Sequence, residues 1–486
     1  MNKQEMNRRS FIGTASAAFA GISVVPGHVV AGLGHAAQSD KLNIAGIGIG
    51  GKGKVNLRNM VGQNMVALCD VDWDYAGDVF KAYPDAKRWK DFRQMLDKQK
   101  DIDAVVIATP DHAHAIQAMS AMQLGKHVYC QKPLTHSVWE ARQLTLAAKK
   151  YGVATQMGNE GHSGDEVRKV AELIRSGTIG EVREVHATTN RPIWPQGLER
   201  PAEIHKVPDY LDWDLFIGPA PFRPFNAAYH PWSWRAWWDF GTGALGDMAC
   251  HVLDVPFYSL NLKYPVGVQA SSSVVNTESA PQASRVTYHF PARPNLPWCA
   301  MPEVKVVWHD GGLTPERSAD IPDGISLTEV NLYIGSKGKI ISGNYGSGFK
   351  VLVDGYTIPT ETLSRIKDDP LGGGRHEMDW VRACKQSPES RTEAASCFEY
   401  AGPLTEMVVM GNLAIRLQGL NRALNWDGEN MKITNVPVDE KVKLITSHQY
   451  KSNNRRPQFK TETKEVNAAE FAEEMIRHTY REGWKW

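Results

Sequence analysis

Short apolar runs alternate with helix-like segments along the first third of the chain. The runs are four to seven residues long, as expected for strands buried on both faces, and the longer segments between them are compatible with helices. Strands are expected at 41–47, 65–69, 104–108, 127–130 and 153–156, and helices at 54–60, 89–99 and 112–124. This alternation predicts an α/β fold with a doubly wound parallel sheet.

The pattern changes after a helix expected at 165–176. Strand-like runs then follow one another without intervening helices, which predicts an α+β domain with a large, mostly antiparallel open sheet. The expected strands are 266–275, 283–289, 304–309 and 331–334, and late helices at 376–386 and 397–417 are expected to pack against that sheet. We interpret the polar stretch 448–464 as a surface excursion.

The first residues have the pattern of an export signal. Arg8 and Arg9 precede Ser10 and Phe11, and a mild apolar run continues to about Val30. This is typical of a twin-arginine signal, which carries folded proteins across the membrane. We therefore predict a signal peptide at 1–37, a mature protein in the periplasm, and domains at 38–157 and 158–486.

The amino-acid composition restricts which classes of binding partner are expected. Lys and Arg total 55 against 54 Asp and Glu over 486 residues, so no charge excess points to nucleic acid or to an anionic membrane surface. The six cysteines are scattered without a C-x-x-C pair, which argues against a zinc knuckle or redox dithiol and leaves one disulfide open. A small, mostly uncharged ligand fits these features better.

A glycine-rich turn follows the first expected strand. Gly48, Gly50 and Gly53 have the G-x-G-x-x-G spacing between a strand and a helix. In that setting the glycines permit a tight turn, close approach of a pyrophosphate and close helix packing. We expect Gly51 and Lys52 within the same turn to contact the cofactor as well.

Asp70 ends the second expected strand, about 20 residues after the glycines. A carboxylate there would hold the adenosine ribose hydroxyls and repel a 2′-phosphate. Since no Arg follows directly, the sequence predicts NAD as the cofactor. The alternative is that Asp70 caps the next helix.

Several longer motifs resemble the glucose-fructose oxidoreductase, inositol dehydrogenase and rhizopine catabolism (Gfo/Idh/MocA) family. They are 48–53, 108–114, 125–133, 158–163 and 241–251, and the ending 480–484 resembles an exported bacterial branch of the family. The resemblance implies that Lys132 binds the nicotinamide end and the reacting hydroxyl, and that Asp247 and His251 form the family's second signature. At position 131 this sequence has Gln, where the family more commonly has Glu. Cofactor contacts are expected from Thr109, Pro110, His112, His114, Gln131, Lys132, Asn159, Trp234 and Arg235.

The chemistry of these side chains suits alcohol oxidation. Such a reaction needs a base for the hydroxyl proton and a positive or hydrogen-bonding group for the developing alkoxide. Lys132 and His251 suit these tasks, and Asp247, four residues before His251 on an expected helix, projects from the same face to hold the substrate or the imidazole. No second His has ligand spacing near His251, so no metal is expected.

An aromatic stretch, 231–240, precedes that helix. Indole faces stack on sugar C–H surfaces, and Arg235 could hold a phosphate or a hydroxyl; the alternative is that most of these tryptophans fill the core or a subunit interface. Trp238 and His162 are further candidate substrate contacts, with Asp247 and His251.

Together these features predict an NAD-dependent oxidoreductase acting on a secondary CH–OH group of a sugar or glycoside, with C3 of a glycoside as the proposed position. Two alternatives stay open: an NAD-dependent, redox-neutral glycoside hydrolase of the same family, and a non-catalytic NAD-binding protein. The expected partners are a small-molecule sugar or glycoside and further copies of the chain, with no nucleic acid and no membrane.

Overall fold

The fold was determined as a computed structural model, which describes residues 40–293, 301–353, 375–453 and 456–486. The predicted signal at 1–37 and Cys299 lie outside the described residues. Asn43–Trp486 form one compact unit.

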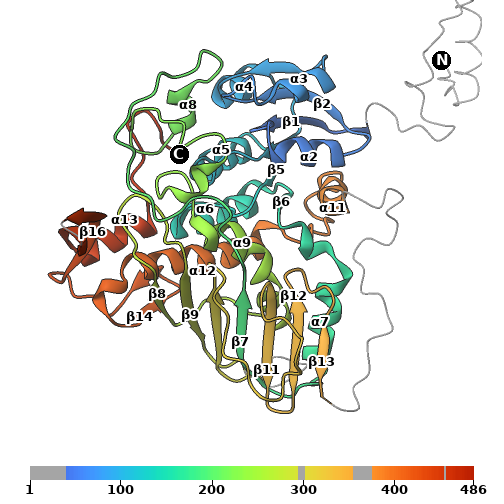
Figure 1. The fold of residues 1–486 in the computed structure, drawn as a ribbon. Coiled ribbons are helices and arrows are strands. Elements are labelled where there is room, and N and C mark those ends of the chain that lie inside the picture. Colours follow the sequence, from blue (N-terminus) through green and yellow to red (C-terminus); the bar gives the residue numbers. More distant parts are fainter. Residues whose placement is uncertain (1–39, 294–300, 354–374, 454–455) are drawn as a thin grey trace, which may run out of the picture. The chain divides into compact units, whose positions relative to one another are not determined.

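The first part of that unit is the predicted parallel sheet (Figure 1). Its six strands run in the order β3-β2-β1-β4-β5-β6, and every neighbouring pair is parallel. The strands are β1 (Asn43–Ile47), β2 (Asn64–Cys69), β3 (Lys87–Trp89), β4 (Ala104–Ile107), β5 (His127–Cys130) and β6 (Thr155–Met157). The helices are α2 (Lys52–Asn59), α3 (Gly77–Ala82), α4 (Phe92–Lys98), α5 (Asp111–Gln123) and α6 (Val138–Tyr151). The predicted doubly wound fold is confirmed.

Local sequence explains these elements. Each residue of β4 is buried, as expected for a central strand covered on both faces. Helix α6 begins with a capping box between Ser137 and Glu140 and ends at Gly152 in the left-handed conformation. The single helix predicted at 89–99 is instead the end of β3 followed by α4, because Asp91 caps α4 through the Arg93 N–H.

The second sheet has nine strands in the order β13-β12-β11-β7-β10-β9-β8-β14-β15. Its pairs are antiparallel except β7 with β10, which confirms the predicted mostly antiparallel sheet. The strands are β7 (Val182–Thr188), β8 (Gly267–Ser272), β9 (Ser284–Phe290), β10 (Val304–His309), β11 (Val330–Gly335), β12 (Lys339–Gly343), β13 (Lys350–Leu352), β14 (Leu424–Asp427) and β15 (Lys432–Ile433).

Helices connect the two sheets (Figure 1). They are α7 (Asp165–Arg175), α8 (Trp213–Ile217), α9 (Gly243–Val252), α10 (Asp254–Ser259), α11 (Arg375–Cys384), α12 (Phe398–Arg416) and α13 (Ala468–Ile476). Helix α12 packs on α6 of the first part and on α9 and β8 of the second. One hydrophobic core therefore runs through both sheets.

One expectation about the last third of the chain is wrong, and another is refined. Helix α11 packs against α2 and β5 of the parallel sheet, where Glu377 accepts hydrogen bonds from Asn56 (2.8 Å) and Asn59 (3.1 Å). The stretch 448–464 lies at the surface, as predicted, and forms part of a long antiparallel ribbon of β16 (Lys441–Asn453) and β17 (Arg456–Asn467). Because much of that ribbon is exposed, its sequence lacks the apolar alternation of a half-buried strand.

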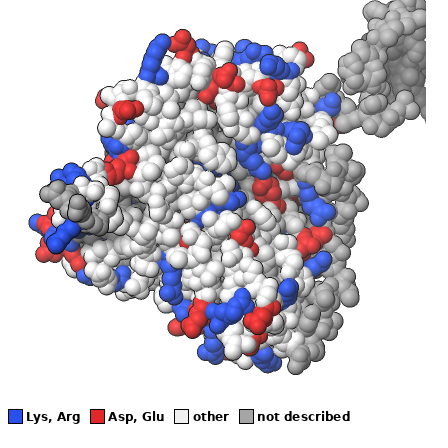
Figure 2. Space-filling view, viewed as in Figure 1, with Lys and Arg blue, Asp and Glu red and all other residues white. Residues whose placement is uncertain are grey.

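The visible surface carries interspersed positive and negative side chains, without a broad field of one sign (Figure 2). Among the described helices, none is both long enough and apolar enough for a membrane crossing.

Candidate active site

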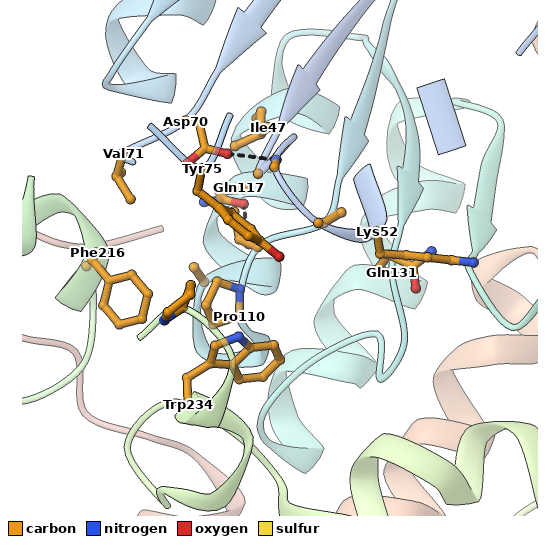
Figure 3. A pocket seen from close by; sticks show the side chains of 18 of the residues that line it. Ile47, Lys52, Asp70, Val71, Tyr75, Pro110, Gln117, Gln131, Phe216 and Trp234 are labelled. Atoms are coloured by element: carbon orange, nitrogen blue, oxygen red, sulfur yellow. Dashed lines mark hydrogen bonds between the residues drawn. The ribbon is translucent and has the colours of Figure 1, made fainter. Parts of the chain in front are cut away.

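One cavity joins most of the predicted cofactor and catalytic residues (Figure 3). Its volume is about 520 Å³, within the range of small-molecule sites. It lies at the carboxyl ends of β1, β2, β4 and β5, the expected edge of a doubly wound sheet, and α9 closes it from the second part. The predicted residues that line it are Gly48, Gly50, Gly51, Lys52, Asp70, Thr109, Pro110, Gln131, Lys132, Trp234, Arg235, Asp247 and His251.

The glycine turn has the close packing that a dinucleotide cradle needs. Gly48 has a φ of +75°, and a Cβ on it would lie 2.7 Å from the backbone of Ala108. A Cβ on Gly53 would lie 2.3 Å from the Gly48 carbonyl oxygen. Helix α2 begins directly after the turn, so its unpaired N–H groups are available to a phosphate.

Asp70 braces this turn. Its Oδ2 accepts hydrogen bonds from the backbone N–H of Ile49 (2.8 Å) and Gly50 (3.1 Å). Burial raises the pKa of Asp70 to about 6, so the carboxylate is mostly ionised at pH 7. A charged acceptor therefore lies next to the turn, where an adenosine ribose would need it.

We expect Asp70→Ala to weaken NAD binding by roughly 10- to 100-fold, because it removes charged hydrogen bonds of about 1.5–3 kcal/mol each. Titrating NAD against the melting temperature measures the change. Asp78→Ala, which removes an exposed carboxylate of α3, is the matched control. Equal affinity in the Asp70 and Asp78 variants would remove Asp70 from the cofactor site.

Lys132 and Asp247 form the centre of the site. Lys132 Nζ donates to the Asp247 carboxylate (2.8 Å) and to its backbone oxygen (2.7 Å). Arg235 Nε donates to the same carboxylate (3.1 Å). Burial alone would raise the pKa of Asp247, but Lys132 and Arg235 lower it to about 2. Asp247 therefore stays charged and fixes the Lys132 ammonium.

His251 lies one turn after Asp247 on α9, as predicted. Burial and the positive charge of Lys132 lower its pKa to about 4, so the imidazole is neutral at pH 7. Within the described part of the chain, its buried Nδ1 has no hydrogen-bond partner. A neutral, unpartnered imidazole in a cavity is suited to accept a proton from a ligand.

The sequence did not identify Glu160 and Tyr345, which complete this polar end of the cavity. Glu160 pairs with Lys52 (2.6 Å), and the Tyr345 ring meets the His251 ring edge-on at 5.3 Å between centroids. Glu160 follows Asn159 within the motif 158–163, so the sequence offered a reason to consider it as a site residue. Tyr345 comes from the turn after β12, and no motif marked it.

His112 and His114 lie beside the cavity rather than in its lining. The His112 ring contacts the carbonyl oxygens of Phe240 (3.2 Å) and Phe216 (3.0 Å). The His114 ring bridges those of Pro133 and Thr109, each at 2.8 Å. Both histidines therefore fasten loops that carry lining residues.

Asp111, the residue before His112, also joins the two parts. Its carboxylate accepts from the backbone N–H (3.0 Å) and hydroxyl (2.6 Å) of Thr242, directly before α9. Burial raises the pKa of Asp111 to about 7. The link fixes the start of the helix that carries Asp247 and His251.

Asn159, His162 and Trp238 are likewise outside the cavity lining. Asn159 and His162 both contact the buried carboxylate of Asp254, at 3.1 and 2.9 Å. Trp238 is buried and donates from Nε1 to the Asn276 carbonyl oxygen (3.2 Å). Their predicted cofactor and substrate contacts remain predictions.

Gln131, the departure from the commoner Glu, lines the cavity beside Lys132. Its amide donates to Asn56 (2.9 Å), and a Cβ on Gly158 would lie 2.4 Å from it. The neutral Gln131 amide is thus held by packing and a hydrogen bond. The carboxylate that contacts Lys132 comes from Asp247 instead.

Among the described residues, Cys69, Cys130, Cys250, Cys384 and Cys397 carry free thiols. The same described ranges contain no group of three or more His, Cys, Asp or Glu side chains placed to hold a metal ion.

These residues fit a bound dinucleotide. The close packing of the turn leaves no room for a side chain at Gly48 or Gly53, and His251 leaves a buried nitrogen unpartnered at the other end. The exposed Tyr75 ring lies over the turn, 2.2 Å from a Cβ built on Gly50. Because this ring shares the space above the turn, we expect it to rotate when a pyrophosphate binds.

The fold and cavity define a two-part protein with a dinucleotide site facing an acid–base cluster. Residues 42–159 match the sequence profile described as "Oxidoreductase family, NAD-binding Rossmann fold", and residues 163–294 match "Oxidoreductase family, C-terminal alpha/beta domain". The chain belongs to the Gfo/Idh/MocA oxidoreductase family, and its first domain is the NAD-binding Rossmann domain of that family.

Curated relatives match part of the chain. Inositol 2-dehydrogenase of Salmonella typhimurium is 31% identical over 185 residues, which are 36% of this chain and 54% of that protein. Levoglucosan dehydrogenase of Pseudarthrobacter phenanthrenivorans is 27% identical over 193 residues, 39% of this chain and 41% of that protein. The chain therefore matches about half the length of these relatives.

Among solved structures, the WlbA dehydrogenase from Bordetella pertussis, in complex with NADH and UDP-GlcNAcA, has a TM-score of 0.54 at 15% identity. The match covers 80% of this chain and 99% of that one. At 15% sequence identity, this similarity shows a shared fold.

Proposed function

We propose that this protein is an exported NAD-dependent oxidoreductase that acts on a secondary CH–OH group of a sugar or glycoside. The observation that carries the proposal is the single cavity with the braced glycine turn at one end and Lys132, Asp247 and His251 at the other. Family membership supports the cofactor, since the matched profile describes an NAD-binding fold.

When bound, NAD would supply the hydride acceptor or donor. The protein's own residues would manage the proton and the oxygen. Neutral His251 would accept the hydroxyl proton as the alcohol is oxidised, and the Lys132 ammonium would stabilise the developing negative charge on that oxygen. Asp247 would hold Lys132 in place, and the buried surroundings would exclude water.

The substrate class is supported by the relatives and by the cavity wall. Inositol 2-dehydrogenase and levoglucosan dehydrogenase are both named for polyhydroxylated rings. Trp234 lines the cavity with its ring against Arg235, 4.3 Å from the guanidinium carbon, and an indole face suits sugar C–H surfaces. We propose a pyranoside oxidised at a ring hydroxyl, with C3 as the position.

The sequence pattern at 1–37 supports export in folded form to the periplasm, and we propose a homo-oligomeric enzyme there. Outside the cytoplasm little free dinucleotide is available, so the enzyme would acquire NAD before export. We therefore expect the purified protein to contain NAD or NADH, detected by mass spectrometry after denaturation. Cofactor-free protein whose melting temperature does not respond to added NAD would refute this prediction.

The substrate test is incubation with a panel of glucosides, free sugars and inositols, each with an electron acceptor or a keto-sugar. The expected product is two mass units lighter than the glucoside, because one hydride and one proton are removed. Activity on inositols or free sugars alone would refute the glycoside proposal. Release of the aglycone without net NADH would favour the redox-neutral hydrolase instead.

A further inference from the structure

The cavity has a second, apolar end that the predicted chemistry does not use. Beyond Asp70 the lining is mostly apolar, with Val71, Phe92, Leu215, Phe216 and Trp484, and Lys90 and Asp91 are the charged neighbours of Phe92. In Figure 3, Val71 and Phe216 lie on the side of Asp70, away from Lys52 and Gln131. An aromatic-walled space next to a ribose-binding carboxylate suits a flat heteroaromatic ring.

Three of these residues come from outside the Rossmann domain. Leu215 and Phe216 belong to α8, which packs on the loop after β2. Two backbone hydrogen bonds hold this contact: the Asp212 N–H donates to the Val71 oxygen (2.9 Å), and the Trp73 N–H donates to the Tyr210 oxygen (3.2 Å). Trp484 comes from the segment Tyr480–Trp484, which we call the closing segment. A distant stretch of chain thus forms a wall of the nucleotide pocket.

Trp484 is held firmly against the Rossmann domain. It is buried, its ring lies 6.2 Å from the Phe92 ring centroid to centroid, and the Arg93 guanidinium carbon lies 4.3 Å from its ring. Arg93 is itself fixed by two-pronged hydrogen bonds to Asp91, of 3.0 and 2.8 Å. The indole therefore has a defined position beside the cavity.

Arg481 fastens the closing segment to α8. Its guanidinium donates to the Gly218 oxygen (3.0 Å), to the Asp214 oxygen (3.1 Å) and to the Asp214 carboxylate (2.5 Å). Its backbone N–H donates to the Pro219 oxygen (2.9 Å). A cation that binds the last carbonyl groups of a helix stabilises that end. Arg481 thus joins α8 and Trp484 into one unit.

We propose that α8 and the closing segment form a clamp over the adenine end of NAD, with Trp484 as one wall and Arg481 as its anchor. This inference rests on the proposed function for its ligand. The adenine, attached to the ribose beside Asp70, would lie in the apolar end, and leaving would require Trp484 or α8 to move. The clamp makes NAD a resident cofactor that stays bound between turnovers.

The experiment measures how fast bound NAD exchanges with isotopically labelled NAD. The variants are Trp484→Ala, which removes the wall, and Arg481→Ala, which removes the anchor and leaves the lining side chains unchanged. Phe459→Ala is the control, because that exposed ring packs on His448 of the β16–β17 ribbon at 4.7 Å between centroids and does not line the cavity. Melting temperatures and circular dichroism of each variant report its fold.

We expect exchange to be roughly 10- to 100-fold faster in Trp484→Ala, the size of loss seen when a buried aromatic anchor is truncated. Arg481→Ala should also exchange faster, and Phe459→Ala should match the parent protein. Parent-like exchange in folded Trp484→Ala or Arg481→Ala would overturn the clamp while leaving NAD binding intact. If the parent protein neither contains nor binds NAD, the proposed function fails, and the clamp with it.

Discussion

His251→Ala is expected to lower turnover by roughly 10²–10⁴-fold, the usual cost of removing one general acid–base group. The physical reason is that the neutral imidazole is the group that we propose as acceptor of the hydroxyl proton. Its position depends on α9 and on the Tyr345 ring beside it. Steady-state kinetics on an accepted substrate measure the loss, and NAD binding should be nearly unchanged, since the dinucleotide cradle is untouched.

The matched control is His289→Ala, which removes an exposed histidine on β9 outside the cavity. Lys132→Ala should resemble His251→Ala in sparing NAD and losing turnover. Near-normal turnover in His251→Ala would remove this residue from the proposed role and leave Lys132 as the remaining candidate base.

The pH profile gives an independent check on His251. A base acts in its neutral form, so activity falls when the pH drops below its pKa. Burial and Lys132 lower that pKa from 6.5 to about 4. The acid limb of turnover for oxidation is therefore expected near pH 4, rather than near 6.5. Because the folded pKa is depressed, the unfolded state binds a proton at His251 first, and the folded state loses stability as the pH falls from 6.5 toward 4.

The parts of the fold that could be predicted are those whose sequence has a clear local pattern of apolar residues. Strands β4 and β5 are short apolar runs with buried residues on both faces, and α7 is strongly amphipathic. The β16–β17 ribbon has no such pattern, and its pairing depends on the partner strand. The docking of α11 on α2 depends on a buried Glu377–Asn56 hydrogen bond between residues 321 apart in sequence, which no local pattern reveals.

The residues of the candidate site also fall into those that the sequence predicts and those that it does not. Gly48, Asp70, Lys132, Asp247 and His251 follow fixed spacings within motifs, and the structure brings them to one cavity. For residues that reach the cavity through tertiary packing, the sequence did not predict a place in the site, even where a motif included them, as 480–484 includes Trp484. Tyr345 arrives from a turn at the edge of the second sheet, and Trp484 from the last residues of the chain. His112 and His114 illustrate the converse, because a motif can mark residues that hold loops together.

Gly53→Ala is expected to reduce NAD binding by on the order of 100-fold or more, because a close backbone contact of about 3 kcal/mol or more has to be relieved. The added Cβ would lie 2.3 Å from the Gly48 carbonyl oxygen and 3.3 Å from the Ala108 Cβ. Since the first of these atoms is backbone, α2 must move away from β1, and the turn's N–H groups shift from their places around the pyrophosphate.

Calorimetric titration of NAD, with circular dichroism to verify the fold, tests this change. Gly77→Ala is the matched control, because a Cβ there meets no atom within 4 Å and the residue is not in the left-handed region. In a helix, alanine is also slightly favoured over glycine, so this control should bind NAD normally and melt no lower. Normal NAD affinity in a folded Gly53→Ala variant would mean that the dinucleotide does not depend on the packing of α2 against the turn, and would contradict the assignment of residues 48–53 as its cradle.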